Sequence, residues 1–174
     1  DSVIINTVGD VFDHGAGVNV TAATLNIQAA RNVGTSVDDI TTAIDTLTAA
    51  GVTGALNVTD EDALAIGALS VADDINIAAA GVLTVNGNGA IGNSVTSSGG
   101  SISLAATALG ADVSILDGVS AMGNISIATL NDLTIDNFGQ VTSTAGDIDL
   151  TAGANMVLTA DGLVNVRTTI GTIT

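Results

Sequence analysis

The sequence has no cysteine, proline, tryptophan or tyrosine, and it contains only two phenylalanines. Without cysteine, a disulfide scaffold and a cysteine-ligated zinc site are excluded. Basic residues are almost as rare, because 2 Lys+Arg residues stand against 18 Asp+Glu residues and give a formal net charge of −16. Nucleic acids and anionic membrane surfaces are therefore excluded as partners, since both require clustered basic side chains. An ordinary intracellular enzyme is disfavoured as well, because such chains rarely lack lysine, tyrosine and tryptophan together.

Long uninterrupted hydrophobic runs are also missing, although the mean hydropathy is +0.59. Residues 75–111 carry no charge, but glycine, asparagine and serine interrupt the stretch well before the roughly 20 apolar residues of a spanning helix. A transmembrane barrel needs aromatic girdles, which Phe12 and Phe138 cannot form. We therefore expect no membrane insertion, and we expect the Ala, Val, Ile and Leu residues to fill a core.

A tripeptide with one polar residue between two aliphatic residues recurs through the second half of the chain. Its copies begin at Ile75, Ile102, Ile125 and Ile148, which are 27, 23 and 23 residues apart. Two further sets of short apolar segments follow these copies in the same order. The second set is 83–85, 113–115, 133–135 and 156–158, and the third is 95–96, 119–120, 141–142 and 164–166.

These segments have the two-residue alternation of β-strands, and the residues between them are the glycine, asparagine, aspartate and serine of tight corners. Three strands and three corners in each repeat describe one rung of a parallel β-solenoid. The sequence therefore predicts an all-β protein: a right-handed parallel β-helix of about seven triangular rungs, each of roughly 23 residues. The handedness follows the usual crossover preference of parallel strands.

The repeats also predict which side chains stack on one another. The aliphatic residues of each tripeptide should point inward onto their own copies, in a core too narrow for tryptophan or tyrosine. Short polar residues that precede each tripeptide should stack at a corner, and its middle residues should face water. The corner residues are Asp74, Ser101, Asn124 and Asp147, and the outward residues are Asn76, Ser103, Ser126 and Asp149.

The chain is predicted to be one solenoid over residues 1–174, with less regular rungs in 1–71 and regular three-strand rungs in 72–174. An irregular insertion is expected near residues 36–51. Ser36 followed by Asp39 resembles a helix N-cap, but the threonines nearby are poor helix formers. We therefore predict an irregular rung in which the segment from Ile44 to Leu47 is extended, with a short helical turn before it.

Candidate catalytic groups are few. His14 is the only histidine. The chain has no lysine, and Arg31 and Arg167 are its only arginines. Parallel β-helices include polysaccharide-active enzymes, but their chemistry needs clustered carboxylates or bases together with cations that hold the sugar. We therefore predict no catalytic and no cofactor-binding residue, and interpret the segment from Asp13 to Gly15 as a turn.

Two clusters of acidic residues give a weak indication of a metal site. Asp60, Glu61 and Asp62, and the pair Asp73 and Asp74, supply oxygen ligands of the type that Ca²⁺ prefers, with Asp60 and Asp62 as first candidates. No EF-hand loop or β-roll nonapeptide accompanies them, so a solvated acidic face with loosely held cations is preferred and no metal ligand is assigned.

Two further patterns are interpreted as architecture. Glycines at 81, 87 and 89 lack the lysine and helix of a phosphate loop and are taken as corner residues. The outward threonines at 84, 134 and 142 alternate with serine and asparagine, so they do not form the regular ranks of an ice-binding face.

Four segments of the chain, 20–27, 32–36, 44–49 and 146–153, resemble the shaft repeats of filamentous-haemagglutinin-like bacterial adhesins. The resemblance implies a right-handed parallel β-helix in an exported, surface-associated structural or adhesive rod. The chain departs from that family in having no match to its amino-terminal secretion domain. It opens with Asp1, Ser2 and Val3 rather than a signal peptide, so we expect a processed product or an internal segment.

Together these observations lead us to expect a non-enzymatic rod segment of an extracellular bacterial adhesin or fibre. Its partners would be further rungs or copies of itself, and the surface of a host or neighbouring cell. The alternative is a filament or surface-layer subunit that stacks end to end through unpaired backbone groups. A polysaccharide-active β-helix enzyme is the distant alternative.

Overall fold

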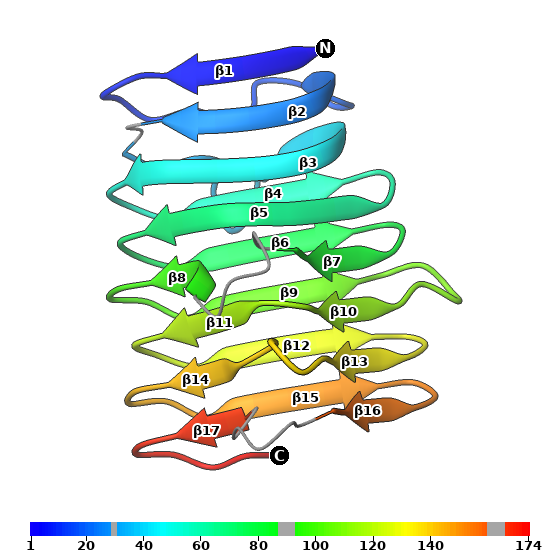
Figure 1. Cartoon of the computed structure of the whole chain (residues 1–174). Coiled ribbons are helices and arrows are strands. Elements are labelled where there is room, and N and C mark those ends of the chain that lie inside the picture. The colour runs from blue at the N-terminus through cyan, green and yellow to red at the C-terminus, as the bar shows by residue number, and fades with distance from the viewer. Residues whose placement is uncertain (29–30, 87–92, 160–165) are drawn as a thin grey trace.

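The structure is a computed structural model that describes residues 1–28, 31–86, 93–159 and 166–174. Within these ranges the chain forms seventeen strands and no helix (Figure 1). Every pairing between named strands is parallel, and successive turns of the chain lie on one another to form a β-solenoid. The predicted all-β solenoid is therefore confirmed.

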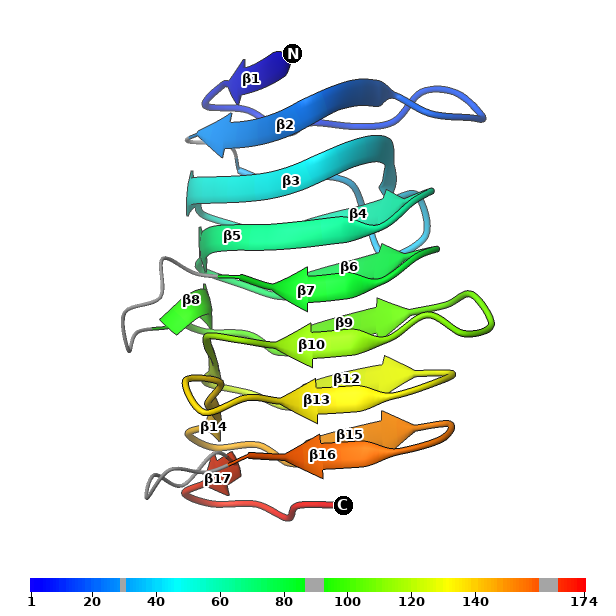
Figure 2. The same ribbon diagram turned by 45° about the vertical axis from the view of Figure 1, so that its right-hand side comes forward.

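One column of paired aliphatic residues runs through the whole stack. Its members are separated by 22, 23, 19, 27, 23, 23 and 25 residues, so the chain completes seven turns close to the predicted period. In Figure 2 the near strands run leftward and the strands behind them run rightward as the chain descends, so the coil is right-handed. The column consists of Val11, Val33, Leu56, Ile75, Ile102, Ile125, Ile148 and Ile173.

In the second half, each turn contributes one strand to each of three faces. The first face contains β4 (Leu56–Asp60), β6 (Ile75–Ala79), β9 (Ile102–Ala106), β12 (Ile125–Thr129) and β15 (Ile148–Ala152). The second contains β7 (Leu83–Val85), β10 (Val113–Ile115), β13 (Leu133–Ile135) and β16 (Met156–Leu158). The third contains β8 (Asn93–Ser97), β11 (Gly118–Ala121), β14 (Val141–Ser143) and β17 (Val166–Thr168). The predicted third segment of the last turn included residues 164 and 165, which lie outside the described ranges.

In the first half, the second and third faces are joined by long, curved strands. These strands are β1 (Ser2–Asn6), β2 (Val20–Gln28), β3 (Ile40–Val52) and β5 (Leu64–Val71). β5 shows the arrangement clearly, because Leu64–Ile66 pairs with β7 and Leu69–Val71 pairs with β8. The less regular rungs expected in residues 1–71 therefore differ from the later triangular rungs by one corner, which is absent from the early turns.

The interior is filled by the aliphatic columns. Inward residues such as Leu83, Val113 and Leu133, which are register neighbours, are 0% exposed. Both phenylalanines lie outside this core, with Phe12 55% and Phe138 41% exposed. The absence of larger aromatic residues is thus consistent with a core whose columns accommodate Val, Ile and Leu.

Polar side chains connect successive turns at the corner before the first face. Each side-chain oxygen accepts a hydrogen bond from the backbone N–H of the equivalent residue one turn later. The bonds join Ser101 N to Asp74 Oδ1 (2.7 Å), Asn124 N to Ser101 Oγ (3.1 Å), Asp147 N to Asn124 Oδ1 (2.9 Å) and Thr172 N to Asp147 Oδ1 (2.7 Å). The predicted stacked corner is therefore confirmed, and these side chains satisfy backbone donors that the strands leave unpaired.

The segment predicted as an irregular insertion, 36–51, is mostly regular. Residues 40–52 form the continuous strand β3, and Ile44–Leu47 is extended as predicted. The irregular part is confined to residues 34–39, where Thr35 and Asp38 form a tight turn through Thr35 N to Asp38 O (2.9 Å). The short helical turn predicted before Ile44 is wrong, because the threonine-rich stretch adopts the extended conformation that β-branched residues favour.

Candidate functional site

The first two turns each leave the solenoid in a short loop at the same place. Residues 12–17 follow Val11, and residues 34–39 follow its register partner Val33. The two loops return to the stack at Asn19 and Thr41. Asn19 N donates a hydrogen bond to Thr41 O, and Thr41 N donates one to Asn19 Oδ1, each 2.8 Å long. The two loops have the same length between these register partners, and both border one recess on the side of the rod. We call them the excursion loops.

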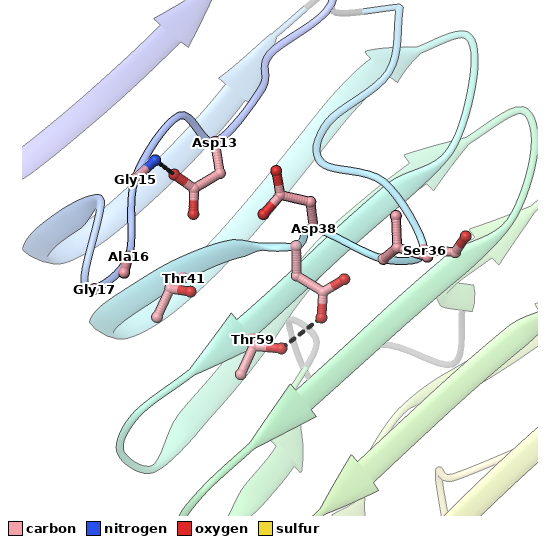
Figure 3. Close-up of a pocket in the computed structure, with 10 residues that line it drawn as sticks. Asp13, Gly15, Ala16, Gly17, Ser36, Asp38, Thr41 and Thr59 are labelled. Carbon is pink, nitrogen blue, oxygen red and sulfur yellow. Dashed lines mark hydrogen bonds between the residues drawn. The ribbon is translucent and has the colours of Figure 1, made fainter.

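The recess has a volume of about 380 Å³ and is open to solvent (Figure 3). Its polar groups are three carboxylates and several hydroxyls, supplied mainly by the excursion loops and by β3 and β4. The lining residues are Asp13, Gly15, Ala16, Gly17, Ser36, Val37, Asp38, Asp39, Thr41 and Thr59.

Two of these carboxylates are held by hydrogen bonds within the fold. Asp13 is 8% exposed, and its Oδ1 accepts bonds from Gly15 N (2.7 Å) and Asn19 Nδ2 (2.8 Å). The Gly15 bond, followed by the Asn19 bond, lowers the pKa of Asp13 below its usual value. Asp39 Oδ2 accepts a 2.7 Å bond from Thr59 Oγ1. Asp13 and Asp39 therefore order the two loops, and the recess as a whole is acidic.

The recess lacks the constellation of an acid–base active site. His14 is exposed, is not among the lining residues, and its imidazole makes no hydrogen bond to another described residue. Arg167 lies on β17 in the last turn, at the opposite end of the rod from His14. The described residues contain no group of three or more His, Cys, Asp and Glu placed to hold a metal ion. The recess therefore provides negative electrostatic potential and hydroxyl groups, but its lining residues include no nucleophile placed beside a base.

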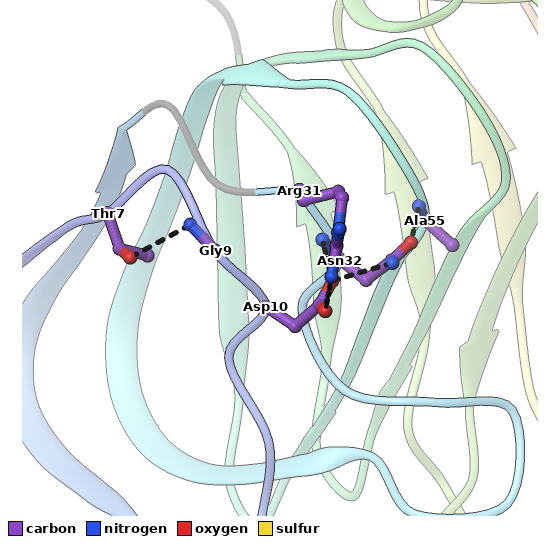
Figure 4. Close-up of polar contacts among 6 residues, drawn as sticks. All are labelled: Thr7, Gly9, Asp10, Arg31, Asn32 and Ala55. Atoms are coloured by element: carbon purple, nitrogen blue, oxygen red, sulfur yellow. Dashed lines mark hydrogen bonds and ion pairs between the residues drawn. The ribbon is translucent and has the colours of Figure 1, made fainter.

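Asp10 and Asn32 together connect the first three turns (Figure 4). Asp10 accepts hydrogen bonds from Arg31 Nε (2.9 Å), Arg31 Nη2 and Asn32 Nδ2 (2.8 Å), and Asn32 Oδ1 in turn accepts one from Ala55 N (3.0 Å). The Arg31 and Asn32 bonds lower the pKa of Asp10 well below its usual range. Asp10 and Asn32 continue the corner ladder described above towards the amino-terminal turns. Arg31 therefore has a structural role that the sequence did not reveal.

The depressed pKa of Asp10 predicts a contribution to acid sensitivity. The unfolded chain takes up this proton near the ordinary pKa of about 4, whereas the folded chain resists it. Asp10 therefore stabilises the fold fully above about pH 4, and this contribution is lost as the pH falls towards the folded pKa. We expect the urea midpoint of Asp10→Asn to decrease less between pH 5 and pH 2 than that of the wild type.

The matched control for this measurement is Asp149→Asn on β15, whose carboxylate makes no hydrogen bond to a described residue. It should retain more of the wild-type pH dependence than Asp10→Asn does. Identical pH profiles for the wild type and Asp10→Asn would contradict the structural role given to the Asp10 and Arg31 pair.

The acidic residues considered as calcium ligands differ in burial and in hydrogen bonding. Asp60 is 0% exposed and accepts bonds from Thr42 Oγ1 (2.7 Å), Ile44 N (3.0 Å) and Asp62 N (3.0 Å). Glu61 and Asp62 are exposed beside it. The oxygens of Asp60 are thus engaged by donors of the chain itself, where β3 passes over the end of β4. Asp74 belongs to the corner ladder, and the neighbouring Asp73 is exposed.

The remaining candidates are parts of the solenoid. A Cβ on Gly81 would lie 2.7 Å from Ala63 N, so this glycine permits close contact between turns, while residues 87 and 89 lie outside the described ranges. Thr84 and Thr134 belong to one outward column with Ser114 between them, and Thr142 lies on the third face. Because serine interrupts this column, it does not form the regular rows of threonine expected of an ice-binding face.

The sequence indicated a turn at Asp13–Gly15 and irregularity from residue 36, but it did not reveal that these two segments border one recess. The only signal of the shared recess is that Val11 and Val33 are followed at the same 22-residue spacing by glycine- and aspartate-containing segments. Comparisons with protein-family models, with curated proteins and with solved structures found no match for this chain. In the described part of the chain, no helix is long and apolar enough to cross a membrane.

Proposed function

We propose that this chain is a non-catalytic rod segment in the shaft of an exported bacterial adhesin or surface fibre. The observation that carries the proposal is the unbroken column from Val11 to Ile173, in which every turn pairs with the next. A filled stack of this kind fixes the distance between whatever lies at its two ends. The resemblance of four segments to adhesin shaft repeats supports the same function.

The surface charge fits such a rod. Eighteen acidic residues against two arginines give a net charge of −16, and like charges keep parallel rods from associating side by side. Inside the stack, continuous backbone pairing and aliphatic columns oppose extension and proteolysis. We place the chain outside the cell, with the surface of a host or neighbouring cell as the partner of the complete adhesin.

The rod function requires a rigid stack, and rigidity can be measured directly. The chain has no cysteine, so Thr24→Cys and Thr134→Cys provide two unique sites for spin labels. These positions lie in one outward column, five pairings apart, which corresponds to about 24 Å between their backbones. Double electron–electron resonance should give one narrow distance distribution. A broad distribution would contradict the rod.

The location is tested with one of the same variants. In the complete protein on intact source cells, Thr134→Cys should react with a maleimide that does not cross membranes, and the wild-type chain gives the background. Labelling only after lysis would contradict the extracellular assignment while leaving the rigidity result untouched.

A filament subunit that stacks end to end is the second candidate. The parallel register that joins each turn to the next would equally join the turns of two copies, because strand edges with unpaired backbone groups accept a further strand. Light scattering distinguishes the two functions, because a filament subunit grows in mass with concentration and a rod segment does not.

A further inference from the structure

An uncharged groove crosses the outer side of the long strands β2, β3 and β5 and the neighbouring strand β8. Its volume is about 570 Å³, and it lies where the long strands curve from the second face to the third (Figure 2). The polar side chains that line it include two amides and three hydroxyls, which belong to Asn26, Gln28, Thr48, Ser70 and Thr96. Methyl groups of Ala50 and Ala68 lie between them.

Within the described ranges, these polar side chains have no hydrogen-bond partner in the chain. Elsewhere in the solenoid, asparagine, serine and aspartate side chains hold one turn to the next, as Asn32 and Asn124 do. In contrast, the side chains of Asn26, Gln28, Thr48, Ser70 and Thr96 make no hydrogen bond to any other described residue. Their donors and acceptors are therefore available, and the groove supplies both kinds.

The charge of the groove restricts the ligand. No residue that lines it is ionisable, although the chain carries a net charge of −16. An anionic ligand would be repelled by the chain and would find no cation in the groove. A cationic ligand would find no counter-charge there, and it would prefer the acidic recess of the excursion loops. An apolar ligand would leave the amides and hydroxyls unpaired. The remaining class is neutral and polar, and hydroxyl groups, which each donate and accept, match a groove that supplies both donors and acceptors.

We propose that this groove binds a neutral oligosaccharide that lies across the turns. Register pairs place Asn26 beside Thr48 and Ser70 beside Thr96, so hydrogen-bonding side chains recur at the spacing of neighbouring strands, about 4.8 Å. A sugar chain presents hydroxyl groups at a comparable repeat, and its C–H surfaces suit the methyl groups of Ala50 and Ala68. This binding site is independent of the proposed rod function.

The proposal is tested by titrating the ¹⁵N-labelled chain with neutral hexaoses, followed by heteronuclear NMR. The probes are cellohexaose, maltohexaose, laminarihexaose, mannohexaose and chitohexaose, with hexagalacturonate as the anionic counterpart. At least one neutral hexaose should give saturable shifts of the Thr48, Ser70 and Thr96 amides, and hexagalacturonate should give none. Shifts from no neutral probe, shifts centred elsewhere, or equal binding of hexagalacturonate would each overturn the proposal.

Substitutions locate the contacts. Thr48→Val and Thr96→Val keep the side-chain shape and remove one hydroxyl each, and each should weaken binding by about three- to tenfold. Thr134→Val removes an outward hydroxyl from the second face, outside the groove, and should leave the affinity unchanged. The spectrum of each variant without sugar confirms that it is folded. Equal affinity of the Thr96→Val and Thr134→Val variants would overturn the assignment of Thr96 to the site.

Discussion

Replacing Gly146 with alanine should lower the free energy of unfolding by about 3 kcal/mol, because the added methyl group has no room. A Cβ at this position would lie 2.4 Å from the carbonyl carbon of Gly123 and 2.5 Å from Asn124 N, both in the backbone of the previous turn. That backbone cannot move away without disturbing the pairing of β12 with β15, which begins at the next residues. The strain therefore falls on the contact between two turns.

Gly146 belongs to a column of glycines at the corner between the third and first faces. At each member, a Cβ would lie within 2.6 Å of an atom in the preceding turn, and none has a positive φ angle. Close approach of the turns, rather than a left-handed backbone, explains why glycine occupies this corner. The column consists of Gly100, Gly123, Gly146 and Gly171.

Thermal unfolding by circular dichroism measures the effect, and a loss of about 3 kcal/mol corresponds to a melting temperature lower by roughly 6–12 °C. Gly15→Ala is the matched control, because its Cβ would meet nothing within 4 Å and its φ angle is not positive. The control should change the free energy of unfolding by less than about 0.5 kcal/mol. Equal melting temperatures for the two variants would refute close packing at this corner.

The regular half of the fold was predictable because the same environment recurs in every turn. Ile75, Ile102, Ile125 and Ile148 occupy equivalent inward positions, so the sequence repeats a similar choice at nearly constant spacing. The corner residues repeat for a comparable reason, since each must present an oxygen to the next backbone N–H. A periodic structure thus leaves a periodic sequence, which can be interpreted without an alignment.

The first half was less predictable because its corners depend on neighbouring turns. Within β3, no local sequence signal shows that one strand continues from the first face through the second and third, and its pairing with β5 shows register shifts. Ser36 and Asp39 matched a helix cap locally, but the loop that contains them is held against β4 by Asp39 and Thr59. Contacts between turns determined the outcome there, and spacing along the chain could not reveal them.

The recess could not be predicted for a related reason. Asp13 and Asp39 are far apart in the sequence, and they line one recess because two loops of equal length lie in register. The acidic run near residue 60 was visible in the sequence, but burial was not. Composition alone suggested a solvated face, whereas the structure separates a fully buried Asp60 from its exposed neighbours.

Asp60→Ala should destabilise the fold by about 4 kcal/mol, because it leaves buried hydrogen-bond donors without a partner. The carboxylate accepts bonds from one hydroxyl and two backbone N–H groups, on Thr42, Ile44 and Asp62. Thr42 and Ile44 are themselves buried, and each buried donor left without a partner costs about 1–3 kcal/mol. Asp60→Asn retains one acceptor oxygen but turns an amide N–H₂ towards these donors, so we expect a loss of about 2 kcal/mol.

Asp62→Ala is the control, because it removes an exposed carboxylate of the same acidic run and keeps the backbone N–H that Asp60 accepts. Its free energy of unfolding should stay within about 0.5 kcal/mol of the wild type. Urea unfolding of the three variants, with calcium and with a chelator, separates a structural carboxylate from a metal ligand. A structural Asp60 gives the same loss in both conditions. If calcium stabilised the wild type and Asp60→Ala removed only that increment, Asp60 would instead be a calcium ligand, and its role at the end of β4 would be wrong.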